Sequence, residues 1–495
     1  MTDPVGTFCL VLHSHLPWLA HHGRWPVGEE WLYQSWAHAY LPVLDVVARL
    51  AAEGRRDLLT LGVTPVLAAQ LDDPHCLRGM HAWLGGWQLR AHGAAARLPD
   101  LARYEHRAAG TALELFERDW RHGASPVLRR LADARAVELL GGPATHPFGP
   151  LLQPGVRAFA LGTGLTDATI RVGTRPSGIW APECAYAPGM EHGYAAAGVR
   201  RFLVDGPALR GDTALARPVG ASDVLAFGRD LDVTYRVWSP RSGYPGGRDY
   251  RDFHTYDHPS GLKPARVTGR RVAPQDKRPY DPERAAAAAA RDAADFVTVV
   301  RDRLAALRAR LGRPALTVAA FDTELFGHWW HEGPAWLEAV LRALPAAGVR
   351  VTTLRGAVDA GMVGGSVTLP ASSWGSGKDW RVWTGPPVAD LVALHERVQK
   401  ALLDAAVPGP ARDPVRDALA TEALLALSSD WAFMVSKDSA AGYARERAFG
   451  HAARVDELAG LLAAGRRRAA EHRIAGWGGD DAVFGHLDAR LLPVA

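Results

Sequence analysis

Two carboxylates in this chain each follow directly after a short apolar run. Glu183 comes two residues after the run 179–181, and Asp322 comes directly after the run 316–321. Such runs are typical of buried strands, and the catalytic groups of α/β barrels lie where strands end and loops begin. Two acids of this kind suit a glycosidase, in which one attacks the sugar carbon and the other protonates the leaving oxygen. We therefore expect Glu183 and Asp322 to be the two catalytic carboxylates.

Both acids also have a structural interpretation. A lone carboxylate is commonly an ion-pair partner, and Asp322 also suits the N-cap of a helix. We favour catalysis for Glu183 because Trp180 and Tyr186 flank it, and aromatic rings beside an acid suit the apolar face of a sugar. We favour catalysis for Asp322 because it follows an apolar strand at once. Glu324 is the rival of Asp322 for the same catalytic role.

Histidines follow two of the other apolar runs. Side chains two residues apart on an extended chain point to the same side, so His13 and His15 could share a metal. The remaining ligands of such a site are harder to find, and we expect hydrogen bonds to a sugar hydroxyl or to a carboxylate instead, with no metal and no cofactor. Glu138 and His146 are expected to bind substrate, the alternative being a plain turn.

Tryptophans are unusually frequent, with 17 in the chain. Several lie in loops that follow predicted strands, and three fall within ten positions between Trp374 and Trp383. Tryptophan carries a polar N–H group and is seldom buried without a partner for it. Clustering in loops therefore favours a carbohydrate cleft over a plain core position. The residues in question are Trp329, Trp330, Trp374, Trp380 and Trp383.

Composition excludes several classes of protein. The chain has 495 residues, 48% of them hydrophobic, which is too many for one minimal domain. The net charge of +4 is small, and the one dense basic run, residues 466–468, suits the solvated face of a helix. No basic and aromatic residues interleave as nucleic-acid binding requires. We expect no nucleic-acid partner.

The three cysteines and the ends of the chain bear on the compartment. Cys9, Cys76 and Cys184 are far apart and never form a C-x-x-C pair, which argues against disulfides and a cysteine zinc site and fits a reducing compartment. No run approaches the ~18 apolar residues of a membrane span. The first residues lack the positive charge of a signal peptide. We expect a cytoplasmic protein without membrane contact, as a monomer or small homo-oligomer.

Apolar runs alternate with helical patterns over most of the chain. Strands are predicted at 7–12, 58–61, 136–140, 178–181, 201–204, 316–321 and 349–353. This alternation implies a parallel sheet with helices outside it, and about seven such units favour a barrel over an open sheet. The helical stretch 66–134 is too long for one crossover. The Gly, Pro and Arg-rich tract 207–282 is expected to be a functional loop or lid.

These patterns predict three domains. We expect an α/β catalytic barrel formed by residues 1–65 and 135–389. Residues 66–134 are expected to form an inserted helical domain, and residues 390–495 a C-terminal all-helical domain.

Five segments resemble, in order, the motifs of glycoside hydrolase family 57, and specifically of its 1,4-α-glucan branching enzymes. The likeness covers nearly the whole chain, with further similar stretches at 23–31, 64–67, 243–246 and 429–433. The five segments are His13–Pro17, Glu138–Leu152, Trp180–Glu183, Phe321–Trp330 and Trp374–Trp383.

The resemblance implies an incomplete (β/α)7 barrel and a retaining mechanism without metal, with Glu183 as nucleophile and Asp322 as acid/base. It also implies that Tyr244 lies on a mobile loop over the cleft and favours transfer over hydrolysis. His13, Trp25, Trp374 and Trp383 would line the donor site. The full set of expected substrate-binding residues is His13, His15, Trp25, Glu138, His146, Trp180, Tyr244, Trp329, Trp374, Asp379 and Trp383.

The activity expected from this resemblance is cleavage of an α-1,4-glucan such as amylose or a glycogen-like polymer, followed by transfer to a 6-hydroxyl to form an α-1,6 branch. A 4-α-glucanotransferase or α-amylase of the same family would make no new branches. A metal-dependent hydrolase or deacetylase that uses His13 and His15 is a less favoured alternative, as is a non-catalytic glucan-binding protein.

Overall fold

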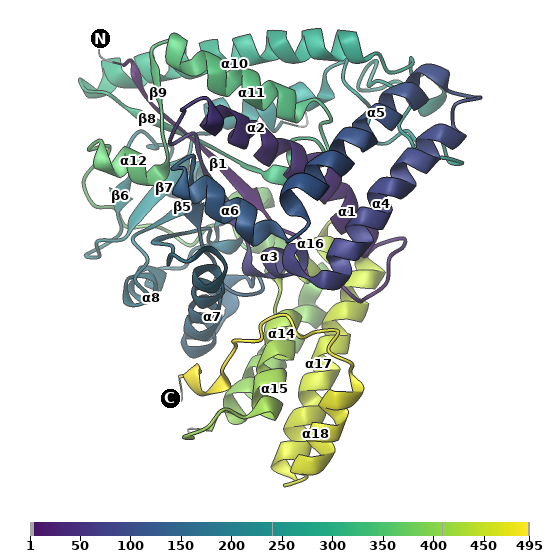
Figure 1. Cartoon of the computed structure of the whole chain (residues 1–495). Helices are drawn as coiled ribbons and strands as arrows, with labels where there is room; N and C mark the ends of the chain where they lie inside the picture. The colour runs from purple at the N-terminus through teal and green to yellow at the C-terminus, as the bar shows by residue number, and fades with distance from the viewer. Residues whose placement is uncertain (1–3, 240, 408, 494–495) are drawn as a thin grey trace.

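The computed structural model describes residues 4–239, 241–407 and 409–493. Its strands form two sheets around the centre of the molecule (Figure 1). In the first, the order is β3-β2-β1-β8, β9 also pairs with β1, and every pairing is parallel. The strands are β1 (Gly6–Ser14), β2 (Leu59–Val63), β3 (Val137–Leu140), β8 (Leu316–Asp322) and β9 (Val349–Val351).

The second sheet has the order β4-β5-β7-β6. Here β6 alone runs antiparallel to its neighbour. Short links join the two sheets: Gly141, after β3, forms a bridge with Ile179 in β4, and the Asp230 amide donates to the Val318 carbonyl of β8 at 2.8 Å. The strands are β4 (Gly178–Ile179), β5 (Arg201–Asp205), β6 (Arg217–Pro218) and β7 (Leu225–Arg229).

Helices lie between successive strands, as the alternating pattern predicts. The long helix α10 begins after Asp281, whose side chain accepts hydrogen bonds from the amides of Glu283 and Arg284, and it has proline at its first position. The helices up to this point of the chain are α1 (Glu29–Ser35), α2 (Leu41–Ala52), α3 (Pro65–Asp72), α4 (Pro74–Gly93), α5 (Pro99–Leu115), α6 (Ala124–Asp133), α7 (Pro154–Val172), α8 (Met190–Ala196), α9 (Leu231–Val237) and α10 (Pro282–Leu311).

The tract 207–282 is more regular than expected. The sequence predicts a loop or lid here, but the structure contains β6, β7 and α9 within it. Strand β7 has the sequence Leu-Ala-Phe-Gly-Arg, and its interior glycine weakens the strand pattern because glycine has no side chain to pack. Burial on both faces by tertiary contacts stabilises β7 nevertheless. The seven predicted strands are all present, with ends that differ by a few residues.

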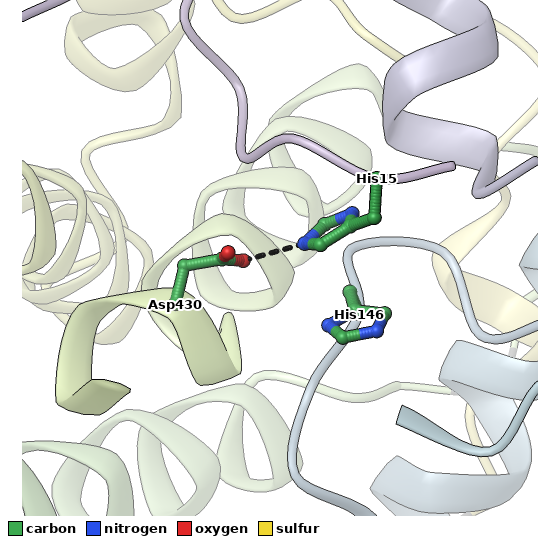
Figure 2. A group of neighbouring side chains, drawn as sticks. All are labelled: His15, His146 and Asp430. Carbon is green, nitrogen blue, oxygen red and sulfur yellow. Dashed lines mark hydrogen bonds and ion pairs between the residues drawn. The ribbon is translucent and has the colours of Figure 1, made fainter. Parts of the chain in front are cut away.

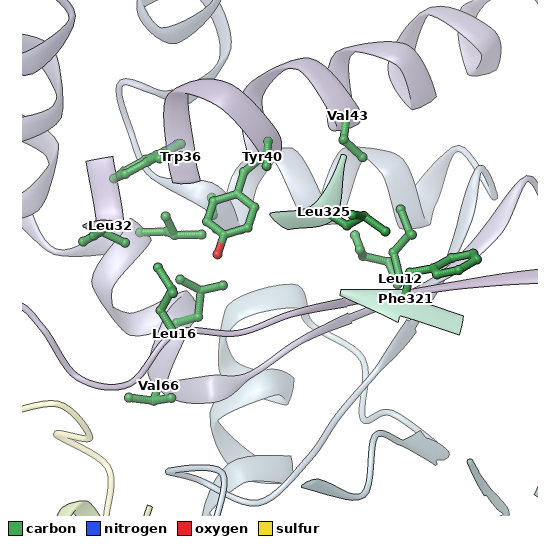
Figure 3. Close-up of a cluster of buried hydrophobic side chains, with 14 of the residues drawn as sticks. Leu12, Leu16, Leu32, Trp36, Tyr40, Val43, Val66, Phe321 and Leu325 are labelled. Carbon is green, nitrogen blue, oxygen red and sulfur yellow. The ribbon is translucent and has the colours of Figure 1, made fainter. Parts of the chain in front are cut away.

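A hydrophobic cluster fixes the ends of β1 and β8 (Figure 3). Leu12 and Phe321 project from neighbouring positions of the two strands and pack beneath Val43 of α2. Tyr40, in the turn of π-helix before α2, extends its hydroxyl through the same cluster towards the strand ends. Because both strand ends are held in a dry core, the residues that follow them have little freedom to move.

The last quarter of the chain is helical, as predicted. Most of these helices gather at one end of the molecule in Figure 1, below the sheets. No helix within the described residues is long and apolar enough to cross a membrane. The helices that follow β8 are α11 (Gly333–Ala346), α12 (Leu354–Asp359), α13 (Arg381–Thr384), α14 (Ala389–Asp404), α15 (Pro414–Ala426), α16 (Ser429–Ser436), α17 (Ala441–Ala463) and α18 (Arg467–Gly476).

Candidate active site

A cavity of about 1170 Å³ opens at the carboxyl ends of the parallel strands. Glu183 and Asp322 both face it. One wall comes from α1 and the loop before it, another from α9 and its following loop, and a third from α16. The expected site residues that line the cavity are His13, His15, Trp25, His146, Glu183, Asp322, Trp329 and Trp374.

Glu183 lies in a single turn of 3-10 helix directly after β4. Its backbone has φ 61°, in the left-handed region that non-glycine residues seldom adopt. Such conformations cost roughly 1–3 kcal/mol and cluster at functional sites. Both carboxylate oxygens accept hydrogen bonds: Oε1 from Ser429 Oγ at 2.8 Å and Oε2 from Trp374 Nε1 at 2.9 Å.

Asp322 is the last residue of β8 and lies opposite His13 in the β1–β8 ladder. Burial, reinforced by the charge of Glu183, raises the pKa of the Asp322 carboxyl to about 7. Glu324 also lines the cavity, but its Oε1 accepts hydrogen bonds from the Tyr40 hydroxyl and from the His15 amide. Burial raises the pKa of Glu324 to about 8.

Hydrogen bonding distinguishes the carboxyls of Glu183 and Asp322, which both line the cavity. Burial raises the pKa of Glu183 to about 7, while its hydrogen bonds from Trp374 and Ser429 act in the opposite direction. Among the described residues, no hydrogen bond to the Asp322 carboxyl is found. Because such bonds stabilise a carboxylate, they favour the charged form of Glu183, while Asp322, which lacks them, more readily keeps a proton. This is the distribution that a nucleophile and a general acid need.

Three imidazoles form a cluster, and one of them, His146, lies beside Glu183 with its Nδ1 atom 3.9 Å from Oε1. The His13 and His146 Nε2 atoms are 3.1 Å apart, and the His15 and His146 rings stack with centroids 3.8 Å apart. His15 Nε2 lies 2.8 Å from Asp430 Oδ2 (Figure 2). Burial opposes ionisation of Asp430, but the charge and hydrogen bond of His15 outweigh it and hold the pKa of Asp430 at about 2.

The cluster of His15, His146 and Asp430 has donor atoms close enough for a metal ion, within 4.8 Å of one another. Each imidazole nitrogen nevertheless has a partner in the protein: His15 Nδ1 contacts Thr64 Oγ1 at 3.0 Å, and His146 Nδ1 contacts Ser429 Oγ at 3.0 Å. The geometry fits a hydrogen-bonded network.

Aromatic rings surround the two acids. Trp25 is 76% exposed at the cavity edge, and Trp329 lies beside Trp238 with ring centroids 5.8 Å apart. Trp180 is buried, stacks on His13 at 4.3 Å and is in edge contact with Trp374. Rings that are exposed at the cavity, such as that of Trp25, suit the apolar faces of sugars.

Four further residues expected to bind substrate lie outside the cavity lining, besides the buried Trp180. Trp383 is buried against Phe148, with its indole N–H donating to the Ser429 carbonyl at 3.3 Å. Asp379 is at the surface in an ion pair with Arg381. The expected substrate contacts of these two side chains are therefore indirect.

The Glu138 side chain likewise makes its contacts within the protein and not with the cavity. Its carboxylate pairs with Arg201 at 2.5 Å and accepts a hydrogen bond from the Arg355 amide at 2.7 Å, within a dry region of β3. The proximity of Glu138 to His146 in sequence suggested a substrate role. In the structure the pleat of β3 turns this side chain towards Arg201, because successive side chains of a strand alternate between its faces.

Tyr244 is buried behind the cavity wall. Its hydroxyl donates to Asp295 Oδ2 at 2.5 Å, and its ring packs near Trp330 and Trp336. The sequence expectation placed this ring over the cleft, whereas the residues just after α9 that reach the cavity are Trp238, Ser239 and Arg241.

Several residues of the site had no assigned role in the sequence. Ser429 and Asp430 lie at the start of α16 in a segment noted only for its likeness. Arg229, at the end of β7, pairs with Asp205 at 2.8 Å and lies over the Trp374 ring. Arg229 was missed together with its strand. For Ser429, the signal available was the run Ser-Asp-Trp in an otherwise apolar helical region.

The fold and the cavity define an α/β enzyme with a pair of buried carboxyls at strand ends, the class to which glycoside-cleaving and glycoside-transferring enzymes belong. Residues 9–360 match the family model for glycosyl hydrolase family 57, and residues 390–492 match that for the C-terminal region of 1,4-alpha-glucan branching enzymes. The chain belongs to glycosyl hydrolase family 57.

Relatives with known names agree with this assignment. A probable 1,4-alpha-glucan branching enzyme of Mycobacterium tuberculosis is 62% identical, over 99% of this chain and 98% of its own length. The crystal structure of a family 57 branching enzyme from Thermococcus kodakaraensis superposes with a TM-score of 0.93 at 27% identity, over 99% of this chain and 96% of its own. An alpha-amylase from Thermotoga maritima gives a TM-score of 0.85 at 26% identity, over 98% and 99%.

Proposed function

We propose that this chain is a 1,4-α-glucan branching enzyme, which cleaves an α-1,4-glucan and transfers the released chain to a glucan 6-hydroxyl. The observation that carries the chemistry is that Glu183, in the turn after β4, and Asp322, the last residue of β8, face one aromatic-lined cavity. The observation that favours branching is the match of residues 390–492 to the C-terminal region of branching enzymes.

The mechanism we propose is a retaining double displacement. Glu183 attacks the anomeric carbon while Asp322 protonates the departing glycosidic oxygen, which breaks the α-1,4 bond and leaves a glycosyl ester on Glu183. Asp322 then takes the proton of the acceptor 6-hydroxyl as its oxygen displaces Glu183. This mechanism requires carboxyl groups roughly 5–5.5 Å apart.

The partition between transfer and hydrolysis depends on access of water to the glycosyl ester. Trp25, Trp238 and Trp329 offer ring faces along the cavity on which a glucan acceptor can lie. A bound acceptor excludes water from the ester and holds its hydroxyl in place, which favours transfer.

The architecture that we propose for this site is a seven-stranded (β/α) barrel. The parallel strands would follow one another around it as β1, β2, β3, β4, β5, β7 and β8, and the links at Gly141 and Asp230 support closure at the two seams. We place the barrel in residues 1–65 and 135–389, the inserted helical domain in 66–134, and the C-terminal domain in 390–495.

A Glu183→Gln variant tests the function by linkage analysis of products from amylose. We expect α-1,6 linkages to be lost, because an amide does not form the glycosyl ester. Glu191→Gln is a matched control: Glu191 is another buried glutamate, on α8 and outside the cavity, with Tyr186 as its hydrogen-bond donor. Normal branching by Glu183→Gln would overturn the assignment.

An α-amylase is the second candidate, because the Thermotoga maritima alpha-amylase resembles this chain over nearly its whole length. The same linkage assay decides between the two candidates. If the wild-type protein is an α-amylase, it will release reducing ends from amylose without forming any α-1,6 linkage.

A further inference from the structure

We propose that Ser429 and His146 are positioning residues for the nucleophile: with His13 they form a hydrogen-bonded chain that runs in one direction and ends on Glu183. This inference rests on the proposed role of Glu183. It makes the C-terminal helices part of the catalytic site, since Ser429 is the first residue of α16.

The hydrogen-bonded chain of side chains is continuous and buried. His13 Nε2 lies 3.1 Å from His146 Nε2, His146 Nδ1 lies 3.0 Å from Ser429 Oγ, and Ser429 Oγ lies 2.8 Å from Glu183 Oε1. All four side chains are less than one-tenth exposed. The segments that supply them are β1, the loop after β3, α16 and the turn after β4, so four distant parts of the sequence meet here.

The direction follows from the number of protons available. An ionised Glu183 can only accept, so the single hydroxyl proton of Ser429 points at Oε1, and the Ser429 oxygen accepts from His146 Nδ1–H. Burial lowers the pKa of His146 well below its ordinary value, so its ring is neutral and Nε2 is an acceptor. His13 must then donate from Nε2.

His13 agrees with this direction. Burial also lowers the pKa of His13 well below its ordinary value, so its ring carries one proton. Its Nδ1 atom is buried and has no hydrogen-bond partner among the described residues. The opposite tautomer would leave a buried N–H without an acceptor and would bring two nitrogen lone pairs together at 3.1 Å.

Hydrogen bonds therefore hold both carboxylate oxygens of Glu183 in place. Trp374 holds Oε2 and the end of the chain holds Oε1, so the carboxylate has one orientation and its charge is stabilised in a dry site. If the hydrogen bonds ran in the opposite direction, Glu183 would have to carry a proton. The chain therefore favours the ionised nucleophile against the effect of burial.

The backbone at two of these positions is also specialised. His146 has φ 58° and Glu183 has φ 61°. The His146 carbonyl accepts a hydrogen bond from the Ser429 amide at 3.1 Å, so the loop and α16 are joined by backbone as well as by side chains. The other ionisable groups near Glu183 are Asp322 of β8, Arg229 of β7, His15 after β1 and Asp430 of α16.

Ser429→Ala tests the chain through the pH profile of kcat/KM. The acidic limb reports ionisation of the nucleophile, and loss of a hydrogen bond to a carboxylate should move that limb up by about one pH unit. Ser429→Thr, which keeps the hydroxyl, should restore it. Ser436→Ala is the matched control, because Ser436 lies on the same helix and bonds the Val382 carbonyl instead. If the acidic limb of folded Ser429→Ala lies at the same pH as that of the wild type, the proposal is overturned.

His146→Asn provides a second test that does not require Ser429 to be changed. Asparagine tolerates the left-handed backbone, and its amide can still donate to Ser429, but the link to His13 is lost. We expect a shift in the same direction and smaller than that of Ser429→Ala. A shift in the opposite direction contradicts the chain.

Covalent labelling separates this proposal from the proposed function. A 5-fluoro-α-glucosyl fluoride should form a long-lived ester, and peptide mass spectrometry locates it. No label on Glu183 in the wild-type protein would mean that the nucleophile is wrongly assigned. Label on Glu183 whose formation has the same pH dependence in wild type and Ser429→Ala would leave the function intact and refute the chain.

Discussion

The indole Nε1 of Trp374 donates a hydrogen bond of 2.9 Å to Oε2 of Glu183. Trp374 is therefore joined to the nucleophile directly and is more than a surface for sugar stacking. The Arg229 guanidinium lies over the face of the same indole, 5.2 Å from its centre, and this cation–π contact helps to hold the ring in place.

Trp374→Phe should raise the acidic limb of the kcat/KM profile. Burial holds the pKa of Glu183 at about 7 against the two bonds that lower it, so removal of one bond moves the pKa further up by about one unit. Because kcat/KM follows the ionised fraction, it should fall about tenfold at pH 6 and only about twofold at pH 8. Trp380→Phe removes a comparable indole N–H, bonded to the Ser372 carbonyl, and should leave the limb in place. If Trp374→Phe and Trp380→Phe gave the same pH profile, the Trp374 hydrogen bond would have no special effect on the pKa of Glu183.

Asp322→Asn should show a loss that depends on the leaving group. Cleavage of amylose needs a proton donor and should fall by about 10²-fold or more. Cleavage of α-maltosyl fluoride needs little protonation of its leaving group and should fall far less. Steady-state kinetics with both substrates measure this difference.

Glu324→Gln is the matched comparison for the acid/base role. Because the Tyr40 hydroxyl and the His15 amide already occupy Oε1 of Glu324, we expect no dependence on the leaving group. If Glu324→Gln shows the dependence and Asp322→Asn does not, the two roles must be exchanged.

Tyr244 is expected to act as the anchor of the loop whose residues Ser239 and Arg241 reach the cavity. Tyr244→Ala removes both the ring packing and the bond to Asp295, so the loop should loosen and more reducing ends should form for each branch made. Tyr244→Phe removes only the bond, at a cost of about 1 kcal/mol, and should change that ratio little. An unchanged ratio in Tyr244→Ala would refute the anchor.

Glu138→Ala should lower stability and leave the site chemistry unaffected. Loss of one member of a buried ion pair leaves Arg201 uncompensated and costs about 3–5 kcal/mol of unfolding free energy. Denaturant unfolding measures this cost, and kcat/KM per folded molecule should stay close to wild type. Asp379→Asn breaks an exposed pair and should scarcely change stability. A stable Glu138→Ala protein with a raised KM would restore a substrate role.

Local sequence was sufficient for the elements with a strong pattern. The apolar runs that end at Glu183 and Asp322 form strands β4 and β8, because a short run of buried residues between polar turns has few other stable arrangements. The helical character of the last quarter of the chain could likewise be predicted from its sequence pattern. Strand β7 was not predicted, because its interior Gly228 resembles loop sequence and its pairing with β5 and β6 and its packing near β8 depend on distant parts of the chain.

The sequence by itself determined which residue types stand at the strand ends, and hence that a carboxyl pair and a set of tryptophans were available. Which of them share one cavity was decided by the tertiary structure. Glu138 is turned to an ion pair and Tyr244 to the back of the wall, while Ser429 is brought to Glu183 from 246 positions along the chain. The physical reason is that a hydrogen bond depends on distance and angle, and separation in sequence carries no information about either.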